Sequence, residues 1–240
     1  MPTLGAHQPN YIPWSGYFNK MALSDCFVLA DDVQYSTQGY TNRTRIKTAQ
    51  GAQWLTVPVL TKGRGLQLIR EVRIDASRNW RRKHWKALCR NYAAAPYFDL
   101  YAGFFDNLYR REWHFLADLN IHIIGHLRRA LGIEGPLCLS SELNIPPCDA
   151  TGRIVQMAEK TGCARYISGR GGSTSYLREG AFREVGIELQ YNDFMHPVYP
   201  QRFGEFISGL SVLDLLFNCG EAAAQQVCRP READIVLEQL

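Results

Sequence analysis

The sequence lacks the features that mark membrane proteins, disulfide-stapled domains and repeat proteins. No apolar run approaches the roughly 18 residues of a membrane-spanning helix, and no basic-then-apolar leader follows Met1. The seven cysteines are an odd number without a Cys-x-x-Cys pair, which argues against a disulfide framework and a thiolate zinc site. No internal repeat or low-complexity linker is present. These absences favour a cytoplasmic globular protein, and we expect residues 1–240 to form a single domain.

Charge is unevenly distributed along the chain, although the net charge is only +4. The composition, with 46% hydrophobic, 12% aromatic and 21% charged residues, is typical of a globular chain. Between Lys62 and Arg90, ten lysines and arginines face only Glu71 and Asp75. Such a stretch suits phosphate groups, whether of a nucleotide, a sugar nucleotide or RNA. A solvated helix face is the alternative interpretation.

The first part of the chain predicts a β-α-β unit followed by a β insertion. A strand at 3–6, a helix from Ser15 to about Ser24 with Ser15 as N-cap, and a continuous apolar strand at 26–30 form the unit. Residues 33–75 then predict an antiparallel piece, whose strands at 53–59 and 66–74 are joined by a turn at 61–65.

The remainder predicts a helical section over 79–132 and then alternating strands and helices. The expected helices are 79–92, 98–111, 112–131, 149–160, 173–180 and 211–218 with a polar tail helix, and the expected strands are 136–139, 164–167 and 187–191. The predicted class is therefore α/β, with a mainly parallel sheet and flanking helices.

The loop from His7 to Lys20 is unusual for a segment between a strand and a helix, because it is rich in aromatic residues and proline. It follows the first strand at its carboxyl end, where open α/β sheets bind ligands. There His7 can act as an acid, a base or an anion stabiliser, with helix N-terminal N–H groups assisting. An aromatic plug over the sheet end is the alternative. The predicted binding residues of this loop are Gln8, Tyr11, Trp14 and Lys20.

Two acidic residues follow the second strand at the same predicted edge. Asp31 and Asp32 can bind Mg²⁺ or act as a base, and they can equally fix a loop. Polar residues close behind them predict a polar pocket: Gln34, Asn42, Arg43 and Lys47.

A glycine-rich segment, Ser168 to Gly172, follows one predicted strand and precedes a helix. In that context it predicts a cradle for phosphate or carboxylate, although it is neither a Walker A motif nor a dinucleotide fingerprint; a tight turn is the alternative. The predicted binding residues are Ser168, Gly169, Gly171, Gly172 and Tyr176.

Two further stretches carry histidine. Arg81, Arg82, Lys83 and His84 lie on a basic helix and predict a phosphate patch; contact with RNA lacks a supporting motif. A second proline-held loop contributes His196, Tyr199 and Gln201 as binding residues, and its histidine can complement the first as acid or base. We predict no metal site from His122 and His126, because no glutamate follows the first as in His-Glu-x-x-His.

Taken together, several of these segments resemble the WbqC-like protein family. They are His7–Lys20, Asp31–Tyr35, Asn42–Arg43, Trp54–Pro58, Tyr166–Gly169 and Leu210–Asn218. The family takes its name from gene clusters for O-antigen and other surface polysaccharides, which implies a role in surface-glycan biosynthesis. The first strand, its histidine loop, the helix and the acidic second strand are also similar to HIGH-type nucleotidyl transferases and pantothenate synthetase. That likeness implies ATP and Mg²⁺, but only His7 stands where those enzymes have two histidines, and no Lys-Met-Ser-Lys-like signature follows.

These observations lead to three functional hypotheses. The first is an enzyme that transfers an activated acyl or aminoacyl group to an amine, with His7, Asp31 and Asp32 as catalytic residues. The second is a non-catalytic protein that binds a sugar nucleotide or a biosynthetic partner. The third is an RNA-dependent aminoacyl transferase, whose RNA binding would weaken steeply with salt.

Overall fold

A computed structural model of the chain describes residues 1–171, 177–228 and 235–236. Over these residues the fold is α/β, as predicted, with five parallel strands in a sheet flanked by helices. The sheet order is β5-β2-β1-β6-β7, and a sixth strand, β8, pairs antiparallel with β7 at the edge. The strands are β1 (Thr3–His7), β2 (Cys26–Leu29), β5 (Leu137–Leu139), β6 (Arg165–Gly169), β7 (Glu188–Asn192) and β8 (Ile235–Val236).

Side chains alternate along the central strands and so divide the core into two clusters. Leu4 and Val28 face the cluster that contains α5 (Ala150–Thr161) and α6 (Glu179–Glu184). Phe27 and Leu29 face the opposite cluster, with α1 (Ser15–Ala22) and α4 (Leu116–Ala130). Gly5 pairs with Phe27, and a Cβ at Gly5 would lie only 2.7 Å from the Phe27 ring. The missing side chain therefore lets that ring lie against β1.

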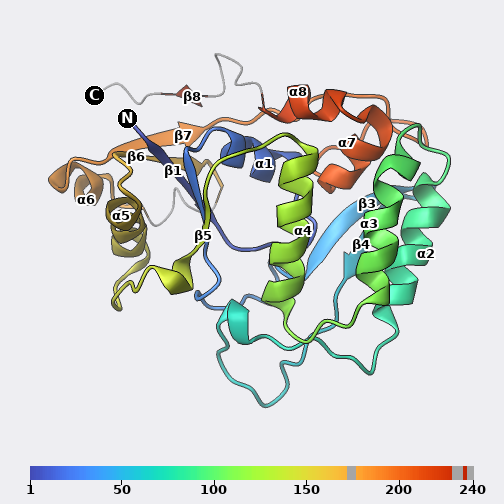
Figure 1. The fold of residues 1–240 in the computed structure, drawn as a ribbon, viewed down its shortest axis with the longest axis horizontal. Coiled ribbons are helices and arrows are strands. Elements are labelled where there is room, and N and C mark those ends of the chain that lie inside the picture. Colours follow the sequence, from blue (N-terminus) through green and yellow to red (C-terminus); the bar gives the residue numbers. More distant parts are fainter. Residues whose placement is uncertain (172–176, 229–234, 237–240) are drawn as a thin grey trace.

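The second cluster extends from the sheet into a helical section. Its further helices are α2 (Trp80–Tyr92), α3 (Phe98–Arg110), α7 (Val212–Cys219) and α8 (Ala222–Cys228). Phe217 of α7 lies at the centre, with ring centroids 5.1 Å from Tyr92 and 5.2 Å from Phe98. Figure 1 shows α4 between the parallel sheet and the pair formed by α2 and α3.

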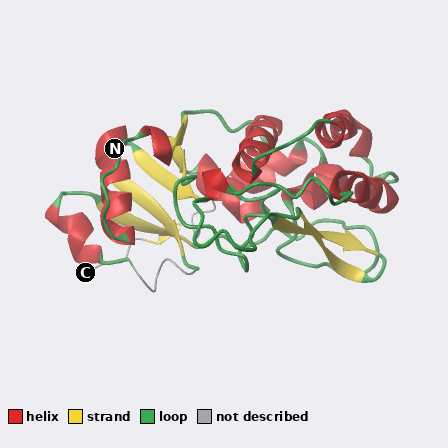
Figure 2. Ribbon diagram, turned by 90° about the horizontal axis from the view of Figure 1, so that it is seen from below, coloured by secondary structure: helices red, strands yellow, loops and turns green. Residues whose placement is uncertain are grey.

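The predicted antiparallel piece is present, but its pairing differs from the prediction. The hairpin joins β3 (Arg43–Thr48) to β4 (Gly51–Thr56) and lies apart from the parallel sheet (Figure 2). The turn is at residues 49–50, before Gly51 at φ 99°. The segment predicted as a strand at 66–74 instead contains a short 3₁₀ helix at Ile69–Glu71 and isolated bridges. Pro58 has no N–H to donate and follows the end of β4, so the ladder does not continue to residue 59.

Two helices also begin at other residues than predicted, and a third predicted helix is described only in part. Helix α4 begins four residues later than predicted, because residues 112–115 are not helical and Phe115 bridges to Arg73. Ser15 was expected as the N-cap of α1, but it is the first helical residue, and Trp14 occupies the cap without a side-chain hydrogen bond. The helix predicted at 173–180 overlaps residues outside the described ranges; the helix that the structure describes there is α6. None of the helices in the described ranges is long and apolar enough to cross a membrane.

Candidate functional site

Parallel strands place several predicted site residues at one edge of the sheet. His7 is the last residue of β1 and pairs with Leu29 near the end of β2, so Asp31 and Asp32 follow at the same edge. On the other side of β1, strand β6 ends with Ser168 and Gly169. Ligands of open α/β sheets bind at this edge. The structure therefore brings these main-chain positions together, as the strand pattern predicts.

His7 is a neutral base in this position. Its Nδ1 lies 3.1 Å from the carbonyl oxygen of Gln8, and a carbonyl only accepts, so Nδ1 carries the proton and Nε2 the lone pair. The rings of Trp14 and Tyr17 lie 5.6 and 4.9 Å away between centroids. Burial, with a further contribution from the Lys20 charge, lowers the pKa of His7 to about 4. The imidazole is therefore uncharged at neutral pH.

Lys20 adds a second buried base beside the first. Its Nζ donates to the carbonyl oxygen of Ala6 at 2.7 Å and lies 5.4 Å from the centroid of the Tyr166 ring. Burial lowers the pKa of Lys20 to about 7. The ammonium and the free amine are therefore both populated near neutral pH.

The second histidine loop reaches the start of α1. Ser15 Oγ lies 3.3 Å from Nδ1 of His196, and burial, together with the charge of Arg45, lowers the pKa of His196. Gly16 makes this approach possible, because a Cβ there would lie 2.7 Å from the ring of Phe194. The second histidine loop therefore contacts the start of α1, and the acid or base role of His196 stays a prediction.

Three other predicted binding residues contact one another instead. Lys47 is buried, and its Nζ donates to Gln201 Oε1 at 3.0 Å and also to the carbonyl oxygen of Glu205. Gln201 in turn donates through Nε2 to the hydroxyl of Tyr199 at 3.2 Å. These bonds hold the loop after residue 198 against β3. They also give the three polar side chains hydrogen-bond partners within the protein.

The two aspartates hold neighbouring elements. Asp31 accepts hydrogen bonds from the Ser141 N–H at 3.0 Å and the Ser141 hydroxyl at 2.7 Å. Asp32 binds Ser140 and Arg153. Burial acts to raise the pKa of Asp32, but the bonds from Ser140 and Arg153 outweigh it, so the pKa lies below its usual value. Catalysis or Mg²⁺ binding by either aspartate stays a prediction, and in the described ranges no group of three His, Cys, Asp or Glu side chains is arranged for a metal.

The glycine-rich segment is described only in part. Ser168 is buried, Gly169 is partly buried, and Gly171 is exposed at the edge of the sheet. Gly172 and Tyr176 lie outside the described residues. Arg170, which lies between Gly169 and Gly171, pairs with Asp193 at 3.1 Å. Asp193 directly follows β7, so this ion pair links the ends of β6 and β7. Gln34, from the acidic segment, is exposed and bridges to Leu68.

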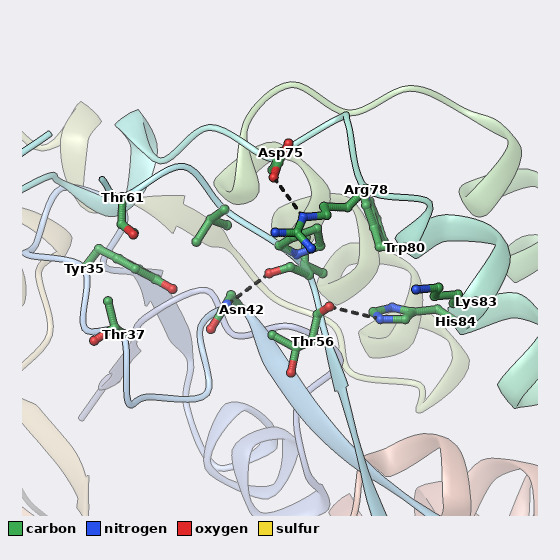
Figure 3. A pocket seen from close by; sticks show the side chains of 13 residues that line it. Tyr35, Thr37, Asn42, Thr56, Thr61, Asp75, Arg78, Trp80, Lys83 and His84 are labelled. Carbon is green, nitrogen blue, oxygen red and sulfur yellow. Dashed lines mark hydrogen bonds and ion pairs between the residues drawn. The ribbon is translucent and has the colours of Figure 1, made fainter. Parts of the chain in front are cut away.

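A cavity of about 480 Å³ lies beyond the 35–42 segment, between the end of β4 and the start of α2. It brings together Asn42, Lys83 and His84, which the sequence places in two separate candidate sites (Figure 3). Sequence reasoning missed other polar lining residues: Tyr35, Thr37, Thr56, Thr61, Asp75 and Arg78. The sequence indicates Asp75 and Arg78 only by their closeness to the basic helix along the chain. What brings their segment to the hairpin is a bridge between Val59 and Ile74, which the sequence pattern does not reveal.

His84 forms one wall of this cavity as a neutral side chain. Its Nε2 donates to the carbonyl oxygen of Thr56 at 3.2 Å, so Nδ1 accepts from the Tyr11 hydroxyl at 2.9 Å. The Tyr11 oxygen then accepts from Tyr109 at 2.7 Å. Burial lowers the pKa of His84 to about 4. Tyr11, predicted to bind ligand, is fully buried and links the opening loop to α2 and α3.

A row of aromatic rings runs from His7 to the hairpin. Trp14 lies 5.6 Å from Tyr40, and Tyr40 lies 5.6 Å from Trp54, between ring centroids. Tyr40 and Trp54 are 44% and 41% exposed. The guanidinium of Arg43 lies 4.5 Å from the centroid of the Trp54 ring. Exposed rings with an adjacent cation can stack on sugars or bases.

The remaining residues of the predicted basic patch point in different directions. Arg81 donates to the carbonyl oxygen of Arg111 at 2.7 Å at the end of α3. Arg82 lines a second hollow, of about 390 Å³, with Trp85 and Arg110. Contact with RNA through this helix stays a prediction.

Comparisons with known proteins place the chain among relatives. The family model of the WbqC-like protein family matches residues 8–226. The uncharacterized protein Rv1507c of Mycobacterium tuberculosis is 39% identical over 218 residues, which covers 90% of this chain and 93% of the relative. A comparison with solved structures gave no significant match.

Proposed function

Since the chain belongs to the WbqC-like protein family, we propose that it is an enzyme of surface-glycan or related small-molecule biosynthesis. In this proposal it transfers an activated acyl or aminoacyl group to an amine and forms an amide. The observation that carries the proposal is His7, a neutral imidazole with its Nε2 lone pair available at the carboxyl end of β1.

His7 supplies the base that amide formation needs. The amine nitrogen bonds to the acyl carbon, and the bond from that carbon to the leaving group breaks. Nε2 takes the proton that the nitrogen loses and passes it to the leaving group. A pKa of about 4 keeps Nε2 unprotonated at neutral pH, although it also makes the imidazole a weaker base than an unperturbed histidine.

Lys20 supplies the complementary charge. Its ammonium, close enough to lower the pKa of His7, favours a carbonyl oxygen that becomes negative or a phosphate leaving group. The aromatic row from Trp14 to Trp54 offers faces for the sugar or base of a donor or acceptor. A requirement for ATP or Mg²⁺ remains an expectation from the likeness to HIGH-type enzymes.

The experiment combines purified protein with activated acyl and aminoacyl donors and amino-sugar acceptors, and detects amide products by mass spectrometry. We expect His7→Gln to lower the rate of product formation at least about 100-fold. His122→Gln is the matched control, because His122 lies on α4 between Phe104 and Trp113, away from the strand ends. An unchanged rate in His7→Gln would exclude the role given to this residue.

A binding protein for a sugar nucleotide is the second candidate, and the exposed aromatic row favours it. In that case uridine diphosphate sugars bind, and Trp54→Ala weakens binding, while no donor and acceptor pair gives a product. Measurable turnover that depends on His7 decides for the enzyme.

A further inference from the structure

We infer that the cavity between β4 and α2 is a binding site for a small phosphorylated sugar, with Lys83 at the phosphate and Asn42 at a sugar hydroxyl. This inference does not depend on the proposed function, because it concerns binding at residues other than His7 and Lys20. It uses the lining residues that Figure 3 shows around one hollow.

The charge of the lining selects an anion. Arg78 and Lys83 are its cations and Asp75 its carboxylate, and His84 is neutral because the ring is buried, which lowers its pKa to about 4. Two cations and one carboxylate give the lining a net charge of about +1. Arg78 pairs with Asp75 at 3.5 Å, whereas Figure 3 shows the ammonium of Lys83 turned toward the other lining residues. Lys83 is thus the cation that a single phosphate meets.

Asn42 provides an independent sign of a ligand. The side chain is 7% exposed, and its Nδ2 donates to the Val57 carbonyl oxygen at 3.0 Å. Its Oδ1 is buried and accepts no hydrogen bond from the residues that the structure describes. A buried acceptor without a donor is costly, by about 1–3 kcal/mol, and is rare in folded proteins. In Figure 3 this oxygen lies on the side of Tyr35 and Thr37, both of which line the cavity.

The other lining groups favour a polyol as the body of the ligand. Three threonines and a tyrosine supply hydroxyl groups that both donate and accept: Thr37, Thr56, Thr61 and Tyr35. A sugar presents hydroxyl groups of the same dual kind, and one of them can donate to Asn42 Oδ1. A volume of about 480 Å³ is within the range of small-molecule sites. Among the residues that the structure describes, Arg78 is paired with Asp75 and Lys83 has no ion pair, so the lining suits a single phosphate better than a polyanion such as RNA.

The test is isothermal titration of the full chain with glucose 1-phosphate, glucose 6-phosphate and ribose 5-phosphate, each compared with the free sugar and with inorganic phosphate. We expect at least one sugar phosphate to bind, and both of its halves to bind more weakly. Lys83→Met should weaken that binding about tenfold, as the loss of a charge-assisted hydrogen bond predicts. Lys86→Met is the matched control, because Lys86 is an exposed lysine of the same helix that does not line the cavity.

Asn42→Ala should also weaken binding, and its melting temperature reports whether the chain remains folded. If Asn42→Ala unfolds, Lys83→Met still decides, because Lys83 is exposed. Binding that is equal in Lys83→Met and in the wild type overturns the inference. The absence of binding by all three sugar phosphates at about 10 mM also overturns it, because that concentration is on the order of ten times the dissociation constant of a weak, millimolar complex. His7→Gln should bind the sugar phosphate unchanged, so the proposed function can fail without this inference failing.

Discussion

Lys20 keeps only 7% of its surface exposed, and its amine has one carbonyl oxygen, that of Ala6, as a close acceptor. Burial disfavours the ammonium and lowers its pKa from 10.5 to about 7. Between these two values the unfolded chain holds a proton that the folded chain has released. The free energy of unfolding therefore rises with pH over this range, as far as this group is concerned.

Lys20→Met tests this linkage. The lost hydrogen bond to Ala6 costs the same at every pH, whereas the contribution from the proton disappears in the variant. The stability of the variant relative to the wild type should therefore fall by about 1.4 kcal/mol per pH unit between pH 7 and 9. Urea denaturation at three pH values measures it, with Lys86→Met as the control for a lost positive charge. A pH-independent difference would show that Lys20 is charged in the folded chain throughout.

At the residue scale, the predicted strand ends located several site residues correctly at one edge of the sheet. The sequence did not reveal which residues their side chains bind. His7 and the aspartates are at the predicted edge because the order of strands and loops requires it. Lys47 was expected at a ligand, yet it binds Gln201, which is 154 residues away in the sequence. Such long-range pairs depend on loop conformation, which no local pattern encodes.

At the scale of an element, two glycines end helices in different ways. Gly162 follows α5 at φ 68°, and a Cβ there would meet no atom within 4 Å. Gly220 follows α7 at φ 57° and ψ −133°, and a Cβ there would lie 2.5 Å from the Tyr97 ring. The backbone conformation favours glycine at both positions, but only at Gly220 does a neighbouring side chain also occupy the space that a Cβ would need.

Gly162→Ala and Gly220→Ala should therefore destabilise the fold by different amounts. We expect about 1 kcal/mol for Gly162→Ala, from the left-handed backbone alone. For Gly220→Ala we expect on the order of 3 kcal/mol, because the Tyr97 ring must also move. Thermal and urea denaturation of the two variants measures the difference. Equal losses would mean that the ring shifts without cost.

The elements themselves were predicted where the pattern was local. Helix α2 begins within one residue of its predicted start, and Asp149 caps α5 through a bond from the Gly152 N–H at 2.8 Å. The predicted pairing of the hairpin strands is wrong, because the segment at 61–65 is richer in turn residues than residues 49–51 and was therefore expected to be the turn. That segment does turn, with Gly63 and Gly65 at φ 73° and 59°, but the chain after it forms isolated bridges and no ladder. Tertiary contacts, which the sequence does not display, decided the pairing.

At the scale of the whole molecule, buried groups with shifted pKa values set the response to acid. His7, His84 and His126 have pKa values of about 4, so between pH 4 and 6.5 the unfolded chain binds three protons that the folded chain does not. Asp214 of α7 acts in the opposite direction, because burial raises its pKa to about 7 despite the charge of Lys47. Its carboxyl is protonated in the folded chain where the unfolded chain has lost the proton. For these four groups the three histidines outweigh the one aspartate.

The free energy of unfolding should therefore fall as the pH is lowered from 6.5 to 4, by about 2.7 kcal/mol per unit from these groups. In Asp214→Asn the opposing contribution is absent, so the slope should steepen to about 4.1 kcal/mol per unit. Asparagine resembles the protonated carboxyl, so the variant should match the wild type near pH 4 and exceed its stability above pH 7. Urea denaturation at pH 4.5, 6 and 8 measures both curves. If the variant is less stable than the wild type at pH 8, then the pKa of Asp214 is not raised in the folded chain and the attraction of the Lys47 charge outweighs burial.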